Sequence, residues 1–221
     1  MTGSSARPLR LVLLGPPASG KGTQGRKLSA SLGLGYLSTG ALLREEVETG
    51  TDVGKLAQPI LARGEYLPDD LMCRIIADWL SRQTGGWVLD GFPRSVPQAR
   101  FLDDLLARQG EKLDAAISLE APFDELISRM HGRVECPECR WSGQTSEATD
   151  DQRCPDCGSP VTSRPDDSVE NLTSRYQEFL RLTRPLIAYY QERNLLSPCD
   201  ATAPRDEVTA QLLNRFEFRI P

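Results

Sequence analysis

The sequence predicts an α/β fold in which helices cover both faces of a parallel sheet. Short apolar runs recur along the chain, and segments with apolar residues at helical spacing lie between them. Glycine and proline separate the two kinds of segment. This alternation is typical of a parallel sheet, because neighbouring parallel strands need a crossover connection. The 221 residues are enough for one such core with small insertions.

The expected strands are apolar runs bounded by turn residues. Residues 9–14 (LRLVLL) stand directly before Gly15 and two prolines, which suits a buried strand. The other expected strands lie near 36–38 and at 87–90 (WVLD), 115–120 (AAISLE) and 195–200 (LLSPCD).

The expected helices follow from apolar residues that recur every three or four positions. They cover residues 20–32, 40–50, 53–63, 69–82 and 95–108, a segment that begins ELISRMHG, and residues 167–192 and 205–217. In the helix 69–82 the expected buried stripe consists of Leu71, Ile75, Ile76 and Trp79. In the helix 167–192 we expect Leu172, Tyr176, Phe179 and Leu180 to share a face, with a kink at Pro185.

Bulk composition narrows the possible partners. The net charge of −5 does not favour a nucleic-acid partner held by overall electrostatics. No apolar run approaches the roughly 20 residues of a membrane span. The first residues, MTGSSARP, lack the apolar stretch of a signal peptide. We therefore expect a cytoplasmic monomer without a nucleic-acid or membrane partner.

The segment 15–23 (GPPASGKGT) has the composition of a phosphate-binding loop between a strand and a helix. Glycines allow backbone N–H groups to surround an anion, and the helix N-terminus adds a favourable dipole. We expect Lys21 to contact the β- and γ-phosphates and Thr23 to lie near magnesium. Gly22 stands where the general motif has Ser or Thr, so Thr23 comes one residue late. The alternative, an ordinary glycine-rich turn, is disfavoured by this context.

Four of the six cysteines form two C-x-x-C pairs, Cys136 with Cys139 and Cys154 with Cys157. This spacing is a strong zinc pattern, and a site of four cysteines has no open position for a substrate. We therefore predict one structural zinc ion that supplies folding energy to a segment poor in apolar residues. Two alternatives stay open: redox pairs, or a ribbon that binds nucleic acid. The acidic residues of the segment disfavour the second: Glu135, Glu138, Glu147, Asp150, Asp151 and Asp156.

The remaining Cys73 and Cys199 are expected to be core residues, and His131 a helix-end residue.

Through most of its length the sequence resembles the adenylate kinase family, in particular members with a zinc-containing lid. The similar motifs are GPPASGKGTQ (15–24), STGALLR (38–44), LDGFPRSVPQA (89–99), RMHGR (129–133), SRPDD (163–167) with Arg175 beyond it, and LTRPLIAYY (182–190). The segment around DGFPR is the most specific of them, and all occur in the family's order.

The resemblance implies a P-loop nucleoside monophosphate kinase core with two insertions. The core would comprise residues 1–37, 68–129 and 168–221, with an AMP-binding insertion at 38–67 and a zinc lid at 130–167. It also implies the reversible transfer of the terminal phosphoryl group of ATP to AMP, giving two ADP. That reaction uses Mg²⁺ with ATP, and it serves purine nucleotide salvage and adenylate energy balance.

The resemblance also implies residue roles. ATP would contact Ala18, Ser19, Gly20, Lys21, Gly22, Thr23, Arg129, Arg133 and Ala203. AMP would contact Thr39, Arg44, Glu65, Tyr66, Leu67, Gly91, Phe92, Pro93, Arg94, Gln98, Arg164 and Arg175. The catalytic set would be Lys21, Arg94, Arg129, Arg133, Arg164 and Arg175, with Thr23 and Asp90 on the magnesium side.

The choice of AMP as acceptor depends on Thr39 and Gln98, because an amide can pair with adenine. Two rival functions remain: a kinase for another nucleoside monophosphate, and a non-catalytic nucleotide-binding or zinc-ribbon interaction protein. The chain also departs from the family's usual residues at Ala18, Ala41, Val134 and Ala201.

Overall fold

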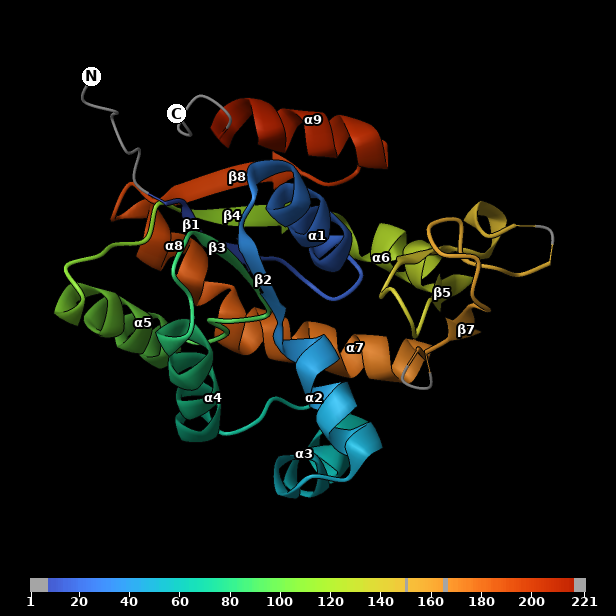
Figure 1. Ribbon diagram of the computed structural model, residues 1–221, viewed down its shortest axis with the longest axis horizontal. Helices are drawn as coiled ribbons and strands as arrows, with labels where there is room; N and C mark the ends of the chain where they lie inside the picture. The colour runs from blue at the N-terminus through green and yellow to red at the C-terminus, as the bar shows by residue number, and fades with distance from the viewer. Residues whose placement is uncertain (1–7, 150, 165–166, 217–221) are drawn as a thin grey trace.

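The computed structural model describes residues 8–149, 151–164 and 167–216 (Figure 1). Within those ranges a parallel five-stranded sheet forms the centre, with strand order β2-β3-β1-β4-β8. Its strands are β1 (Arg10–Leu14), β2 (Gly35–Ser38), β3 (Trp87–Asp90), β4 (Ala115–Glu120) and β8 (Leu196–Asp200). The predicted α/β class and the five expected strands are confirmed.

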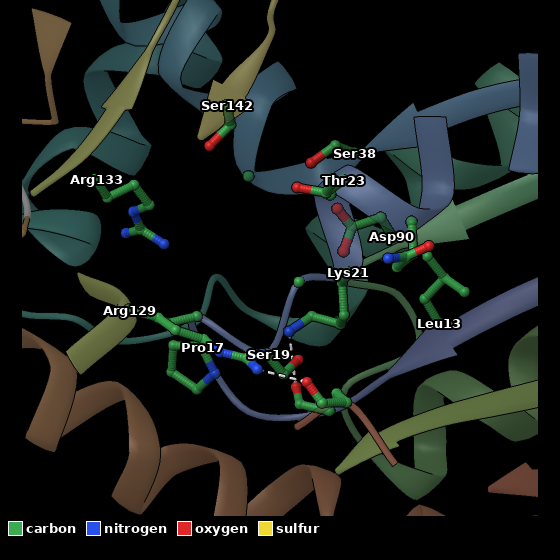
Figure 2. Close-up of a pocket in the computed structure, with 18 of the residues that line it drawn as sticks. Leu13, Pro17, Ser19, Lys21, Thr23, Ser38, Asp90, Arg129, Arg133 and Ser142 are labelled. Atoms are coloured by element: carbon green, nitrogen blue, oxygen red, sulfur yellow. Dashed lines mark hydrogen bonds between the residues drawn. The ribbon is translucent and has the colours of Figure 1, made fainter. Parts of the chain in front are cut away.

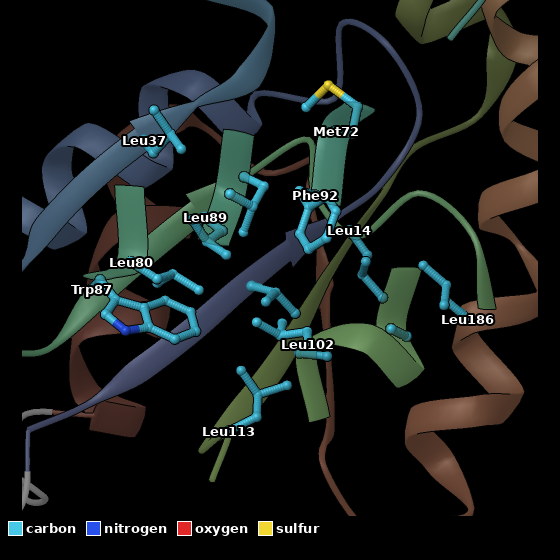
Figure 3. Packing of buried hydrophobic residues seen from close by; sticks show 14 of the residues in the cluster. Leu14, Leu37, Met72, Leu80, Trp87, Leu89, Phe92, Leu102, Leu113 and Leu186 are labelled. Atoms are coloured by element: carbon cyan, nitrogen blue, oxygen red, sulfur yellow. The ribbon is translucent and has the colours of Figure 1, made fainter. Parts of the chain in front are cut away.

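Helices lie on both sides of this sheet (Figure 1). Their bounds are α1 (Lys21–Leu32), α2 (Thr39–Thr49), α3 (Asp52–Ala62), α4 (Asp69–Ser81), α5 (Val96–Arg108), α6 (Phe123–Met130), α7 (Val169–Glu178), α8 (Pro185–Gln191) and α9 (Arg205–Phe216). Alternate residues of β1 point to opposite faces, as strand geometry requires. Leu11 and Leu13 pack with α1 and α9. Val12 and Leu14 pack with α4, α5 and α8, the side on which Trp87 and Leu102 also lie (Figure 3).

The buried stripe of α4 confirms the expectation at Ile76 but not at Leu71, Ile75 and Trp79. Met72, Ile76 and Leu80 are the buried residues of this helix, whereas Leu71, Ile75 and Trp79 are only partly buried. Apolar residues occur in adjacent pairs along α4, so two neighbouring stripes have the right period. Packing against the sheet, rather than the local pattern, selects between them.

The expected long helix from 167 to 192 is broken into three parts in succession. A π-helical turn, Phe179–Thr183, separates α7 from α8. Proline has no N–H, so Pro185 cannot complete the helical bond to the carbonyl four residues earlier. Arg184 instead donates its N–H to the carbonyl of Phe179, five residues back, at 2.8 Å. The predicted interruption near Pro185 is confirmed, and its form is a π turn followed by a new helix start.

Two segments project beyond the strand ends that carry the site. One contains α2 and α3; the other, residues 130–167, is called the lid segment below (Figure 1). The described part of the lid segment contains a small antiparallel sheet of β5 (Arg133–Glu135), β6 (Ser142–Gln144) and β7 (Thr162–Ser163), with a 3-10 turn at Thr145–Glu147.

Some predictions fall on residues outside the described ranges. These are 1–7 and 217–221 of the expected core, Asp150 of the acidic set, and residues 165 and 166 of the SRPDD motif. Among the described residues, none of the helices is long and apolar enough to cross a membrane.

The packing of β3 gives a stability prediction. Leu89 is 0% exposed between helices of the core, whereas Leu56 on α3 is 61% exposed. Leu89→Ala should lower the free energy of unfolding by about 2–5 kcal/mol, because it leaves a cavity in a close-packed core. Leu56→Ala should change it by less than about 0.5 kcal/mol. Urea unfolding of both variants checks this, and equal losses would contradict the assigned packing.

Candidate active site and metal centre

A cavity of about 520 Å³ lies at the carboxyl ends of β1 and β3. Ligands of open parallel sheets bind at this edge, where loops and helix N-termini converge. The loop after β1 forms one wall, and Arg129 of α6 and Arg133 of the lid segment face it across the cavity (Figure 2). Every residue predicted to contact ATP lines the cavity: Ala18, Ser19, Gly20, Lys21, Gly22, Thr23, Arg129, Arg133 and Ala203.

The loop at residues 15–20 has the geometry of an anion site. Gly15 has φ +144°, and a Cβ there would lie 2.5 Å from the carbonyl oxygen of Leu119, so only glycine fits. The Lys21 side chain folds back and donates to the carbonyl oxygens of Gly15 at 2.8 Å and Pro16 at 2.7 Å (Figure 2). The hydroxyl of Ser19 is buried and has no hydrogen-bond partner among the described residues. A buried orphan donor in such a loop fits a phosphate oxygen.

Electrostatics at the loop favour a bound anion. Desolvation lowers the pKa of Lys21 to about 8, Asp90 opposes the shift, and nearby arginines reinforce it. A phosphate would stabilise the charged form of the amine. Tyr36 donates to Oδ2 of Asp90 at 3.0 Å, and burial followed by the Asp90 charge raises the pKa of this phenol well above its usual value. The Tyr36 phenol therefore keeps its proton and donates a hydrogen bond to Asp90.

Ala18 occupies a left-handed backbone conformation, with φ +62°. This conformation costs an L-residue about 1–2 kcal/mol relative to glycine. The departure from the family's usual residue at Ala18 therefore carries a conformational cost. Its methyl group also packs against the cluster of Leu126, Met130 and Leu172, which offsets part of that cost.

The predicted catalytic arginines converge on the cavity, and carboxylates accompany several of them. Arg129 donates to Glu125 at 2.8 Å and to the carbonyl of Ala201 at 2.5 Å. Arg133 forms an ion pair with Asp167. Arg164 pairs with Glu135 at 2.5 Å. Arg94, Arg164 and Arg175 also line the cavity.

A second cavity, of about 430 Å³, lies between α2, α3 and the end of β3. It shares seven lining residues with the first: Gly40, Arg44, Tyr66, Gly91, Arg94, Glu135 and Arg175. The predicted AMP residues Thr39, Glu65, Leu67 and Gln98 line it as well. Pro93 and Arg164 line the first cavity instead, close to this junction.

One predicted AMP residue faces away from both cavities. The Phe92 side chain is 0% exposed and packs in the hydrophobic core beneath the site (Figure 3). Its neighbours Gly91 and Arg94 do face the cavities. At Gly91 a Cβ would meet the Thr39 hydroxyl at 2.4 Å, which explains the glycine.

The amide of Gln98 is held at both ends. Its nitrogen donates to Oδ1 of Asp69 at 2.7 Å, and its oxygen accepts the N–H of Arg94 at 2.7 Å. Asp69 also accepts from Ser95 at 2.7 Å. One N–H and one lone pair of the amide are left for a ligand, in an orientation that Asp69 fixes. The Arg94 guanidinium lies 4.1 Å from the centre of the Tyr66 ring.

Four sulfur atoms gather in the lid segment. The Sγ atoms of Cys136, Cys139, Cys154 and Cys157 all lie within 4.8 Å of one another. Between the two C-x-x-C pairs, the Sγ atoms of Cys136 and Cys157 are 3.5 Å apart, and those of Cys139 and Cys154 are 3.4 Å apart. Zn–S bonds of about 2.3 Å in a tetrahedron place sulfurs about 3.8 Å apart, so the cluster fits zinc. Hydrogen bonds from the backbone and hydroxyl of Ser159 lower the pKa of Cys157 to about 6, whereas burial raises the pKa values of Cys136 and Cys139. The assignment to zinc therefore depends on the spacing of the four sulfur atoms.

The other cysteines and the histidine lie as expected. Cys199 is buried, and Cys73 is partly buried against the core. His131 caps the end of α6.

The sequence analysis missed two residues of the site. Asp69 lies 29 positions from Gln98 in sequence, and no local pattern connects them. Glu135 was assigned only to an acidic surface, but it lines both cavities. The alternation of Arg133, buried Val134 and Glu135 could have placed Glu135 on the cavity side. The same alternation shows that Val134 points away from the site.

The strained loop predicts an unusual response to glycine. In Ala18→Gly, relief of the left-handed strain should offset the greater freedom of the unfolded chain and the lost methyl contact. The free energy of unfolding should therefore stay within about 0.5 kcal/mol of the parent. Ala30→Gly, at an exposed position inside α1, should cost about 1 kcal/mol. Denaturant unfolding compares them, and a larger loss for Ala18→Gly would refute the strain.

Comparisons with known proteins agree with this geometry. The family model "Adenylate kinase" matches residues 13–195. The adenylate kinase of Streptomyces coelicolor is 39% identical over 214 residues, which cover 95% of this chain and 99% of that protein. Those of Kosmotoga olearia and Paracoccus denitrificans are 37% and 38% identical, over 95% and 92% of this chain and 99% and 95% of their own lengths. The chain belongs to the adenylate kinase family, and its function is that family's phosphotransferase activity.

Proposed function

We propose that the two joined cavities carry out the reversible transfer of the terminal phosphoryl group of ATP to AMP, which gives two ADP. The observation that carries the proposal is their junction. A phosphate-loop lysine and several arginines line the larger cavity, and the smaller cavity opens onto Arg44, Arg94 and Arg175 of the same set. Two phosphate-bearing ligands could therefore meet end to end among these cations.

In the proposed mechanism ATP occupies the larger cavity. The backbone of residues 18–23, the Ser19 hydroxyl and Lys21 hold its phosphates, and Ala203 lies beside the adenine. The transfer needs little covalent chemistry from the protein, because positioning and positive charge on the equatorial oxygens lower the barrier. Arg94, Arg129, Arg133, Arg164 and Arg175 supply that charge. Mg²⁺ bound with ATP would neutralise part of the phosphate charge, and Thr23 and Asp90 would be its protein neighbours.

AMP occupies the smaller cavity in this proposal. Arg44, Arg164 and Arg175 hold its phosphate, and the walls from Thr39 and residues 65–67 enclose its base and sugar. Gln98 reads the adenine edge with the remaining donor and acceptor of its amide. Asp69 supports this reading, because the bond to the Gln98 nitrogen keeps the amide from turning over.

We propose that residues 38–67 act as the AMP-binding insertion and residues 130–167 as the lid over the core. Arg140 of the lid segment contacts Glu45 of α2 at 3.3 Å, and Glu147 contacts Arg205 at the start of α9 at 2.7 Å. These pairs support a lid that closes on both other parts. Closure excludes water, which would otherwise compete with AMP for the phosphoryl group.

We further propose one structural Zn²⁺ on Cys136, Cys139, Cys154 and Cys157. Four thiolates leave no open position, so the ion folds the lid segment and takes no part in the transfer. We also propose that the protein acts as a monomer. With a net charge of −5, small nucleotides in the cytoplasm are its proposed partners, without nucleic acid or membrane.

A nucleotide panel tests the reaction. With ATP and magnesium, we expect faster ADP formation with AMP than with CMP, UMP or GMP. Lys21→Met should lower kcat/KM by about 10²–10³-fold, because it removes charge from the transferring phosphates. Lys112→Met, at an exposed position outside both cavities, should match the parent. Faster turnover with CMP or UMP would identify a kinase for another base. No ADP formation with any acceptor would favour a binding protein.

Metal analysis tests the zinc centre. Protein purified under reducing, chelator-free conditions should contain about one zinc per chain. Cys157→Ser should lose the ion and make the lid segment sensitive to protease, because metal binding supplies its folding energy. Its kcat should fall, since Arg133 and Arg164 belong to that segment. Cys73→Ser, outside the cluster, should retain the zinc. A zinc-free parent with an intact lid segment would refute the centre.

A further inference from the structure

Glu135 is a carboxylate that lines both cavities and has no part in the mechanism above. It is the last residue of β5. Its Oε2 atom lies 2.5 Å from Nε of Arg164 and 3.8 Å from Nη2 of Arg44. Both arginines are proposed to hold the AMP phosphate. One acidic oxygen therefore contacts two cations that a substrate phosphate is expected to use.

Strand geometry explains why Glu135 faces inward. Side chains alternate between the two faces of a strand, and the middle residue of β5, Val134, is 6% exposed. Arg133 and Glu135 therefore share the face that lines the larger cavity. The Glu135 side chain is 23% exposed, so the carboxylate is part of the cavity wall rather than of the outer surface of the lid segment.

The carboxylate of Glu135 lies among positive charges whose mutual repulsion it reduces. Burial lowers the pKa of Arg164 to about 10, and Arg133 and Arg44 add to the shift by repulsion, whereas Glu135 opposes it. Cations gathered in a partly buried space need an anion nearby. An AMP phosphate would be such an anion when bound, and among the described residues Glu135 pairs with both Arg164 and Arg44.

We propose that Glu135 is an internal substitute for the AMP phosphate, which AMP must displace from Arg164 and Arg44 in order to bind. This inference rests on the proposed AMP site and deepens it. Arg44 belongs to α2, whereas Arg164 and Glu135 belong to the lid segment. The carboxylate therefore also joins these two parts when no nucleotide is present. Glu135 neutralises the empty site and, in doing so, weakens the binding of AMP.

Calorimetric titration of Glu135→Gln with AMP and with adenosine tests this competition. The variant keeps the shape of the side chain and removes its charge. We expect it to bind AMP about three to ten times more tightly than the parent, as loss of a competing, partly buried ion pair would allow. Adenosine has no phosphate to compete with Glu135, so its affinity should stay within a factor of two. KM for AMP should fall in parallel.

A matched control separates competition from general loss of charge. Glu45 pairs with Arg140 and joins the same two parts of the chain, but it lines neither cavity. Glu45→Gln should leave AMP affinity within a factor of two. Zinc content and thermal unfolding of each variant report whether the lid segment stays folded. Glu135→Ala provides a second variant without the carboxylate if Glu135→Gln loses zinc.

Three results would overturn the inference. AMP affinity that is unchanged or weaker in a zinc-bound Glu135 variant would make Glu135 a support for the arginines, not a competitor. Equal tightening in Glu45→Gln would indicate a general charge effect. Equal tightening for adenosine would remove the link to the phosphate. Failure of the proposed function is a separate outcome, because it would appear in the parent as no preference for AMP over adenosine and no ADP formation.

Discussion

The site depends on holding several positive side chains together in one partly buried space. Lys21 lies within the influence of Arg94, Arg133 and Arg175, and desolvation together with their repulsion lowers the pKa of its amine. Arg164 is affected in the same way. An arrangement of this kind stores unfavourable energy until an anion arrives, and that energy is released where negative charge develops. Carboxylates pair with several of these cations, among them Glu125 with Arg129 and Glu135 with Arg164.

The positive side chains of the site come from different helices, strands and segments of the fold. The β1 strand lies in the middle of the sheet and sets the loop that carries Lys21. Arg44 belongs to α2, Arg94 follows β3, and Arg129 lies in the last turn of α6. Arg133 and Arg164 belong to the lid segment, whose fold we attribute to a metal rather than to an apolar core. Because these elements differ, motion of one part can separate the charges and closure can bring them together.

The sequence predicted most of the fold because its signals are local. Apolar runs beside Gly15, and before Gly91, are sufficient to identify the central strands, and Pro185 is sufficient to predict an interruption. The error in α4, at Leu71, Ile75 and Trp79, has a different origin. Leu71 with Met72, and Ile75 with Ile76, give two overlapping stripes, and only the position of the sheet decides between them.

The site was predictable where motifs are continuous and not where contacts are distant. The phosphate loop and the cysteine pairs are short patterns with a direct chemical meaning. The support of Gln98 by Asp69 joins residues from two helices, and their side chains meet only after the chain has folded. Phe92 shows the converse, since it stands inside the most specific motif but packs into the core. Membership in a motif does not specify the direction of each side chain.

The π turn between α7 and α8 changes the direction in which side chains point before and after it along the axis. An extra residue in a helical turn offsets everything that follows by about 100° around the axis. Before the turn, Leu172 packs beside α6 and Arg175 faces the cavities. After it, Leu186 and Tyr190 are fully buried against the sheet. Without the extra residue, Leu186 and Tyr190 would be rotated away from the sheet while Leu172 and Arg175 kept their present contacts. The π turn therefore allows α7 to present residues to the site and α8 to present residues to the core, although the two helices follow each other directly.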